Sequence, residues 1–253
     1  MKKNIGIFAL LLLMAAPVFS KSWKLVWSDE FNYTGLPDST KWTNEVGMVR
    51  NKEAQYYTQK RIENNRVENG NLLLIARKEP YKGAEYTSAS LKTKGKYQCM
   101  YGKIVARMKL PRQQSLWPAF WMIGTDTSNP QWPFCGEIDI MEQISRENKV
   151  YGTIHWAANG KHAQYGTKVD CDVEKFHDYA IEWDEKGIRW FVDDKQYFES
   201  KNDSIKTTDG AFNHPYFLIV NLAIGGGWPG YPDETTCLPD TAAIDYIRVY
   251  QKK

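Results

Sequence analysis

The chain has no dense run of lysine and arginine and no paired cysteine motif. Its 253 residues carry a formal net charge of +3, and none of the cysteines Cys99, Cys135, Cys171 and Cys237 forms a C-x-x-C pair. A nearly neutral chain is weakly attracted to nucleic acid or to an anionic membrane. Isolated cysteines do not support a zinc or redox motif. The sequence therefore favours a neutral partner, and polysaccharide is one such class.

The N-terminal apolar stretch is too short for a membrane span. Ile5 to Phe19 is about 15 residues, whereas a spanning helix needs roughly 20. Two lysines precede the stretch, and Val18–Ser20 resembles a cleavage site, so residues 1–20 are predicted to be a signal peptide. We therefore expect a secreted or periplasmic protein without a membrane anchor. Export permits disulfides, but the sequence does not choose among the three complete cysteine pairings or between disulfides and buried thiols.

Residues 21–253 contain no linker, no internal repeat and no persuasive helical periodicity. Short segments rich in Val, Ile, Tyr, Phe and Trp recur between turn residues, as β-strands should. This pattern predicts one all-β domain built as an antiparallel sandwich. The clearest predicted strands are Leu72–Ala76, Lys103–Met108, Tyr179–Trp183, Ile188–Val192, Phe217–Leu222 and Ile244–Tyr250.

Three acidic residues in the segment Gly136–Glu142 carry the most chemical information. In a strand, alternate side chains share a face, so Glu137 and Asp139 point the same way. Regular alternation would next place Met141 beside them. One extra residue, a β-bulge, returns Glu142 to the acidic face. The segment therefore predicts three carboxyl groups on one face of a bulged strand.

The spacing of Glu137 and Glu142 suits a retaining glycosidase. After the bulge their Cα atoms are about 13 Å apart, and long side chains on a curved strand can bring the carboxyls to the roughly 5–5.5 Å that direct attack requires. The same pattern also fits a solvated acidic strand face. Clustered like charges are nevertheless typical of sites that use perturbed pKa values.

Aromatic residues around this segment predict contacts with sugar rings, because flat aromatic faces pack against pyranose C–H faces. The chain has ten tryptophans. Trp228 lies in a Gly/Pro-rich loop, and such loops are usually at the surface. The candidate contacts are Trp117, Trp121, Trp132, His155, Trp156 and Trp228. Core packing is the alternative, and we expect it for Trp23, Trp27, Trp42, Trp183 and Trp190.

Five segments together resemble glycoside hydrolase family 16, particularly its laminarinase-like β-glucanases. They span nearly all of the chain after the predicted signal peptide. The E-x-D-x-x-E pattern has the bulged form typical of the laminarinase-like branch. The segments are Trp27–Phe31, Trp117–Met122, Gly136–Glu142, Asn221–Gly226 and Ile244–Tyr250.

The resemblance implies a β-jelly roll of two curved antiparallel sheets with glycan lying across a concave cleft. It also implies Glu137 as nucleophile, Asp139 as its electrostatic helper and Glu142 as acid/base. Burial and the neighbouring Glu137 charge should raise the pKa of Glu142 and leave it protonated for the first step. Catalysis would then need no cofactor.

The resemblance further implies binding residues and a structural ion. Asn51 falls in a segment that often touches the glycan, and Trp117, Trp121, His155 and Trp228 match positions along the cleft. Many relatives hold calcium away from the cleft, and the matching ligands here are Glu30, Asp245 and the Gly70 carbonyl. Oxygen ligands suit calcium, although an ordinary acidic surface pair explains the same residues.

The predicted function is endo-hydrolysis of β-1,3-glucan, mixed β-1,3/1,4-glucan or both, by a monomer whose partner is the polysaccharide. Three alternatives stay open on the same fold. They are a galactan-cleaving hydrolase, a transglycosylase and a non-catalytic glycan-binding module. The binding module would use the aromatics but would not need Glu137, Asp139 and Glu142 together.

Overall fold

A computed structural model describes residues 22–125, 128, 131–201 and 210–253. The predicted signal peptide, residues 1–20, lies outside this part of the chain and stays a prediction. Within the described residues every regular element is a β-strand. A search of the same residues finds no helix with the length and apolar character of a membrane span.

The larger sheet has ten strands in the order β15-β14-β13-β8-β17-β5-β6-β3, with β1 added beside β17 and β4 beside β5. All its pairings are antiparallel except β3 with β6. Its strands are β1 (Trp23–Asp29), β3 (Gln55–Tyr57), β4 (Asn65–Glu68), β5 (Asn71–Tyr81), β6 (Ala84–Ser88), β8 (Gly102–Lys109), β13 (His177–Asp184), β14 (Gly187–Val192), β15 (Lys195–Lys201) and β17 (Asp240–Lys252).

The smaller sheet has seven antiparallel strands in the order β12-β11-β10-β9-β16-β7-β2. The segment with the three acids is its central region. Its strands are β2 (Thr43–Asn44), β7 (Ser90–Lys92), β9 (Leu116–Gly124), β10 (Glu137–Glu142), β11 (Lys149–Ala158), β12 (Lys161–Asp170) and β16 (Tyr216–Ile224).

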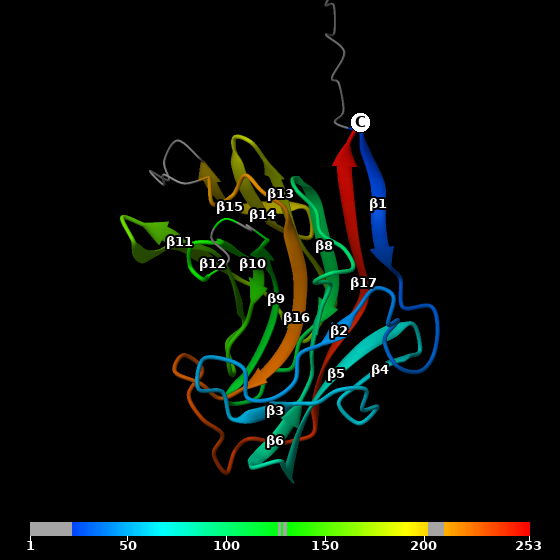
Figure 1. Cartoon of the computed structure of the whole chain (residues 1–253). Helices are drawn as coiled ribbons and strands as arrows, with labels where there is room; N and C mark the ends of the chain where they lie inside the picture. The colour runs from blue at the N-terminus through cyan, green and yellow to red at the C-terminus, as the bar shows by residue number, and fades with distance from the viewer. Residues whose placement is uncertain (1–21, 126–127, 129–130, 202–209) are drawn as a thin grey trace, which may run out of the picture.

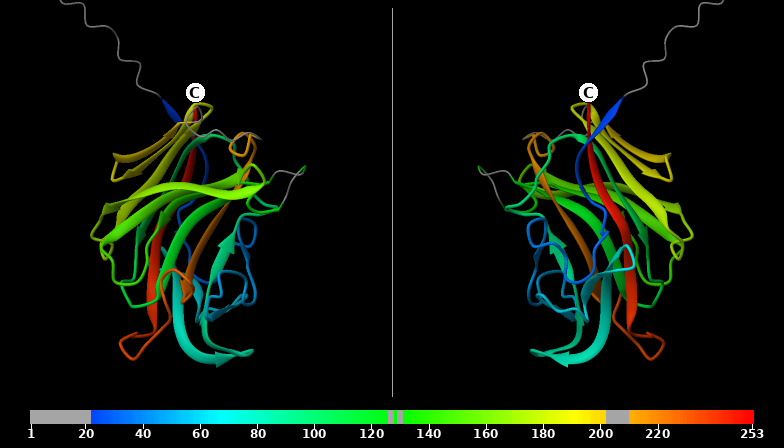
Figure 2. Two further views of the ribbon diagram at one scale, coloured as in Figure 1. Left: turned by 90° about the vertical axis from the view of Figure 1, so that its left-hand side faces the viewer. Right: turned by 90° about the vertical axis from the view of Figure 1, so that its right-hand side faces the viewer.

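The two sheets form the curved layers of a β-sandwich (Figures 1 and 2). One continuous apolar cluster fills the space between them and takes side chains from both, such as Ile104 and Val249 from the larger sheet and Ile138 and Val220 from the smaller. Burial of apolar surface on one face of each sheet is the main force that holds the layers together. The predicted all-β sandwich is confirmed.

The strands that the sequence predicted are those with an apolar face. Each of the six predicted segments lies inside a strand, namely β5, β8, β13, β14, β16 and β17. Strand β12 was not predicted, because nearly all of its residues are exposed and it has no apolar alternation to read. It is held as the edge strand of a hairpin by ten paired positions with β11.

Buried tryptophans and cysteines are part of the core. Trp42, Trp183 and Trp190 are buried as predicted, whereas Trp23 and Trp27 are only partly covered. All four cysteines lie in the described residues and none is in a disulfide; Cys237 is exposed and the other three are buried. The structure thus favours thiols over disulfides.

Candidate active site

Strand β10, which lies between β11 and β9 in the smaller sheet, contains the predicted bulge. Its register shifts between Asp139 and Glu142 against β11, and between Asp139 and Met141 against β9. Met141 and Ile138 belong to the core cluster, so Glu137, Asp139 and Glu142 lie together on the opposite face. We call this outer face of the smaller sheet the acidic face.

Strands β11 and β9 place a defined residue on each side of every acid. Glu137 pairs with His155 of β11 and Ile123 of β9. Asp139 pairs with Thr153 and Trp121 of the same two strands, and Glu142 pairs with Tyr151 and Ala119. Trp121 also belongs to a second apolar cluster, separate from the core, that includes Phe217 and Ile219 of β16. The acidic face therefore has an apolar floor beside its carboxyl groups.

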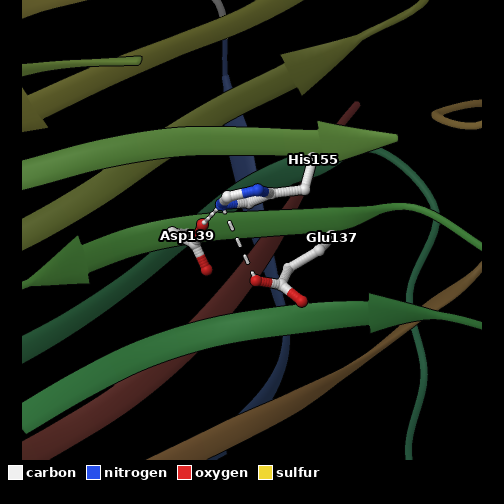
Figure 3. A group of neighbouring side chains, drawn as sticks. All are labelled: Glu137, Asp139 and His155. Atoms are coloured by element: carbon white, nitrogen blue, oxygen red, sulfur yellow. Dashed lines mark ion pairs between the residues drawn. The ribbon is translucent and has the colours of Figure 1, made fainter. Parts of the chain in front are cut away.

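His155 links two of the acids. Its Nε2 atom is 3.0 Å from Asp139 Oδ2 and 3.9 Å from Glu137 Oε1, and Figure 3 shows its ring reaching over both side chains from the neighbouring strand. His155 Nδ1 is 2.9 Å from His162 Nε2. The His162 ring packs 4.7 Å from that of Trp132. His155 thus lies between Asp139, at ion-pair distance, and His162, with which it shares a hydrogen bond.

Glu137, Asp139 and His155 also have the spacing of a metal site, because their ligand atoms lie within 4.8 Å of one another. Two carboxylates and one imidazole could hold a divalent transition metal. In glycoside hydrolysis by two carboxyl groups, such side chains act as carriers of protons and charge.

Glu142 is held at the other end of the acidic face by tryptophan. The indole Nε1 of Trp117 donates to Glu142 Oε1 at 2.9 Å. Trp228 packs edge-on against Trp117, with ring centroids 5.4 Å apart, and against Tyr151 at 4.9 Å. Trp117 is therefore a direct partner of the acid as well as part of an aromatic wall.

Burial raises the pKa of all three acids, and repulsion by neighbouring acids adds to the effect at Glu137 and Glu142. For Glu137 the larger cause is burial, followed by the Asp139 charge, while His155 and Trp132 act in the opposite direction. Burial raises the pKa of Asp139 too. The pKa of Glu142 is raised well above its usual range, by burial and then by the charges of Asp139 and Glu137. Glu142 is thus suited to carry a proton at neutral pH.

This arrangement predicts a pH-dependent stability effect. Because the pKa of Glu142 is raised on folding, its stabilising contribution is present below the unfolded pKa and is lost as pH rises through the folded pKa. Glu142→Gln removes that loss. We expect its melting temperature to exceed that of the wild type by a margin that grows as the pH rises above about 4. Glu199→Gln, at an exposed position of β15, is the control, and a margin independent of pH would contradict the assignment.

Two further predicted residues, Trp121 and Asn51, also lie at the acidic face. Trp121 Nε1 donates to Asn221 Oδ1 at 2.7 Å, and the Arg50 guanidinium lies 5.0 Å from the Trp121 ring. Asn51 Nδ2 donates to Glu53 Oε1 at 3.2 Å. A Cβ on Gly226 would lie 3.2 Å from the Asn51 carbonyl oxygen and 3.7 Å from the Trp117 ring. Asn51 is therefore next to the aromatic wall.

One predicted contact is wrong. His155 and Trp156 are adjacent in β11, so their side chains point to opposite faces of the sheet. Trp156 is in the core cluster, and its ring packs 6.2 Å from that of Phe212. Trp132 and Trp228, by contrast, are 48% and 43% exposed and available to a ligand.

The residues predicted to bind calcium are occupied by other contacts. Both oxygens of Glu30 accept hydrogen bonds from Arg248, the shortest at 2.7 Å. Asp245 forms an ion pair with Arg107 at 3.4 Å. Gly70 lies in the turn before β5, whose Leu72 pairs with Ile244. A cation at Glu30 would therefore have to compete with Arg248.

Comparison with known proteins assigns the chain to a family. Residues 50–248 match the model of glycosyl hydrolases family 16. The chain is 43% identical over 244 residues to a protein of Rhodothermus marinus named Beta-glucanase, an alignment that covers 90% of this chain and 85% of that protein. The chain therefore belongs to glycosyl hydrolases family 16.

Solved structures agree with this assignment. The laminarinase from Rhodothermus marinus has a TM-score of 0.84 and 41% identity, covering 92% of this chain and 98% of that one. A mutant of SCLam, a non-specific endo-beta-1,3(4)-glucanase of the same family with a cellobiosyl-glucose at its active site, has a TM-score of 0.84 and 39% identity, covering 94% and 97%. The predicted laminarinase-like resemblance and jelly roll are confirmed.

Proposed function

We propose that this protein is a retaining endo-β-glucanase that hydrolyses β-1,3-glucan and mixed β-1,3/1,4-glucan. The observation that carries the proposal is the bulge of β10, because it places Glu137, Asp139 and Glu142 on one face. The names of the Rhodothermus Beta-glucanase and of the SCLam glucanase support the same substrate class. Glycan would lie across the acidic face.

In the first step Glu142 donates its proton to the glycosidic oxygen while the Glu137 carboxylate attacks the anomeric carbon. The C–O bond to the leaving chain breaks, and that chain departs with a free hydroxyl group. A covalent glycosyl ester on Glu137 remains. Because its pKa is raised, the Glu142 carboxyl group carries a proton that it can donate in this step.

In the second step water attacks the same carbon. Esterification has removed the negative charge of Glu137, so the pKa of Glu142 falls and its carboxylate can take the proton of water. The ester bond breaks, the Glu137 carboxylate is restored and the sugar leaves with its original anomeric configuration.

His155 and Trp132 would help to keep Glu137 in its reactive, charged state, against the opposite effect of Asp139. His155 Nε2 lies 3.0 Å from Asp139 and 3.9 Å from Glu137, and His155 lowers the pKa of Glu137, which opposes the rise that the Asp139 charge causes. Trp132 assists by hydrogen bonding to Glu137 and lowering its pKa.

Product analysis with a panel of polysaccharides tests the proposal. We expect laminarin, lichenan and barley β-glucan to lose viscosity quickly and to give short oligosaccharides, with little action on cellulose. Activity confined to agarose or carrageenan would instead identify a galactan-cleaving enzyme. Formation of longer chains would identify a transglycosylase, and binding without any product would identify a glycan-binding module.

Trp228 tests the aromatic wall separately from the acids. It is 43% exposed, and its contacts are to Trp117 and Tyr151. Trp228→Ala should weaken laminarin-oligosaccharide binding about five-fold, equivalent to about 1 kcal/mol, with the melting temperature nearly unchanged. Isothermal titration calorimetry measures the affinity. Trp132→Ala, at the other end of the acidic face, is the comparison, and an unfolded Trp228→Ala protein would place Trp228 in the core.

We further propose that the protein is exported through cleavage after residue 20 and acts as a monomer outside the cytoplasm. The N-terminal lysines and apolar stretch support export, and a polysaccharide substrate is too large to be taken up before it is cut. Mass spectrometry of the protein recovered from the medium or periplasm identifies the cleavage site.

Calcium binding at Glu30, Asp245 and the Gly70 carbonyl is a separate proposal. Two carboxylates and a carbonyl are suitable donors, and the cation would have to displace Arg248 from Glu30. A chelator should then lower the melting temperature, because an ion bound only to the native state stabilises it. Activity well below the melting temperature should not change. An unchanged melting curve and no calcium by elemental analysis would mean that Arg248 alone satisfies Glu30.

A further inference from the structure

The bulge of β10 is held from behind by the opposite sheet. The ladders on both sides of β10 lose register immediately after Asp139. At that point the Asp139 carbonyl oxygen accepts a hydrogen bond of 2.8 Å from Nε1 of Trp190. Trp190 belongs to β14 of the larger sheet and is fully buried, so this contact crosses the core.

A glycine makes room for the contact. Gly152 lies on β11 between Tyr151 and Thr153, which pair with Glu142 and Asp139. A Cβ on Gly152 would lie 2.6 Å from Cδ1 and 2.9 Å from Nε1 of Trp190, and 2.6 Å from the Tyr197 hydroxyl. Because real atoms do not approach so closely, any larger residue here would displace the indole from its position beside the Asp139 carbonyl and would also press on Tyr197.

We propose that Trp190 is a positioning residue that fixes the bulge of β10 and thereby the placement of Glu142 relative to Glu137. The proposal rests on the proposed function of these two acids. A strand without the bulge would turn Glu142 toward the core and Met141 toward the acidic face, because one residue of slip exchanges the faces. A buried carbonyl also needs its donor, so losing the indole N–H loosens the backbone at the bulge.

Trp190→Phe is the direct test, because phenylalanine keeps an aromatic ring in the core and removes the N–H donor. Trp183→Phe is a matched control. Trp183 is equally buried, at 1% exposure against 0%, and its Nε1 also donates to a backbone carbonyl, that of Phe212 at 3.1 Å, which lies outside β10. Both variants should lose similar stability in thermal unfolding.

The two variants should differ in catalysis. Displacement of a catalytic group by about 1 Å can cost on the order of 100-fold. We therefore expect Trp190→Phe to lower kcat on laminarin by about 10- to 100-fold with KM within about two-fold, because the glycan contacts are untouched. Trp183→Phe should keep kcat within about two-fold of the wild type. The loss in Trp190→Phe should be smaller on an aryl glycoside, whose leaving group needs less help from Glu142.

A second variant and an activity-independent measurement make the test complete. Gly152→Ala keeps the Trp190 side chain but displaces it, and should give the same selective loss of kcat. Hydrogen exchange of the peptide covering residues 138–143 should speed up in Trp190→Phe and Gly152→Ala but not in Trp183→Phe. Unchanged exchange, or equal loss of kcat in Trp190→Phe and Trp183→Phe, would overturn the positioning role. Absence of wild-type hydrolysis would instead overturn the proposed function, while the exchange comparison would still report on the bulge.

Discussion

Glu137→Ala should abolish hydrolysis of laminarin while the protein stays folded. Asp139, the acid nearest in sequence, is engaged by His155 at 3.0 Å, and Glu142 is engaged by Trp117 at 2.9 Å, so neither replaces Glu137 in forming the covalent ester. Loss of a group that forms the bond itself typically costs at least about 1,000-fold in kcat. Reducing-sugar release measures the rate, and oligosaccharide affinity should stay close to that of the wild type.

The stereochemistry of the wild-type reaction checks the same assignment. Two inversions at one carbon return the original configuration, so proton NMR should first detect the β-anomer. Burial raises the pKa of the Glu137 carboxyl group, so its removal should not destabilise the fold. Glu137→Gln is the isosteric control. An initial α-anomer would mean a single displacement by water, and Glu137 would then not be the nucleophile.

Most of what could be predicted from the sequence came from one local pattern, the alternation of side chains between the two faces of a strand. The bulge of β10 was predictable because strand alternation fixes the face of each residue, and only an inserted residue puts Glu142 beside Glu137 and Asp139. The apolar strands were predictable for the same reason. Applied to β11, this rule would also have separated His155 from Trp156, whose predicted glycan contact is wrong.

Contacts between distant segments could not be predicted. His162 meets His155 only because β12 folds back along β11, and an exposed polar strand gives no signal in the sequence. Trp190 was correctly expected in the core, but its partner in β10 is 51 positions away along the chain. Trp117 was predicted as a sugar contact, which stays a prediction, and the hydrogen bond from its indole N–H to Glu142 was not foreseen. Pairings of this kind depend on how the two sheets and their hairpins come together.

The direct contact between Trp117 and Glu142 changes how variants of the aromatic wall should be interpreted. Trp117→Ala would remove a ring from the wall and a hydrogen bond that lowers the pKa of Glu142. Its effects on KM and kcat are therefore mixed. Trp228, which contacts Trp117 and Tyr151 but not Glu142, is the cleaner probe of binding, and Glu142 itself is the cleaner probe of proton transfer.

Glu142→Ala should separate proton donation from nucleophilic attack. On laminarin the leaving oxygen needs a proton, so kcat should fall by at least about 100-fold. On an aryl β-glucoside with a good leaving group, formation of the glycosyl ester on Glu137 should be much less affected. Hydrolysis of this ester should stay slow because no base activates water. A burst of aryl alcohol should therefore precede a slow steady state.

Azide should then restore turnover of Glu142→Ala on the aryl glycoside. The small anion fits the space left by the carboxyl and attacks the anomeric carbon without needing a base. Because it displaces Glu137 from the opposite side, the product should be the β-glycosyl azide, which NMR distinguishes from the α-anomer. Glu137→Ala treated in the same way should give no β-azide, since it forms no ester. A β-azide from Glu137→Ala, or an α-azide from Glu142→Ala, would exchange the two roles, because the anomer formed reports which carboxyl group remains to attack the sugar.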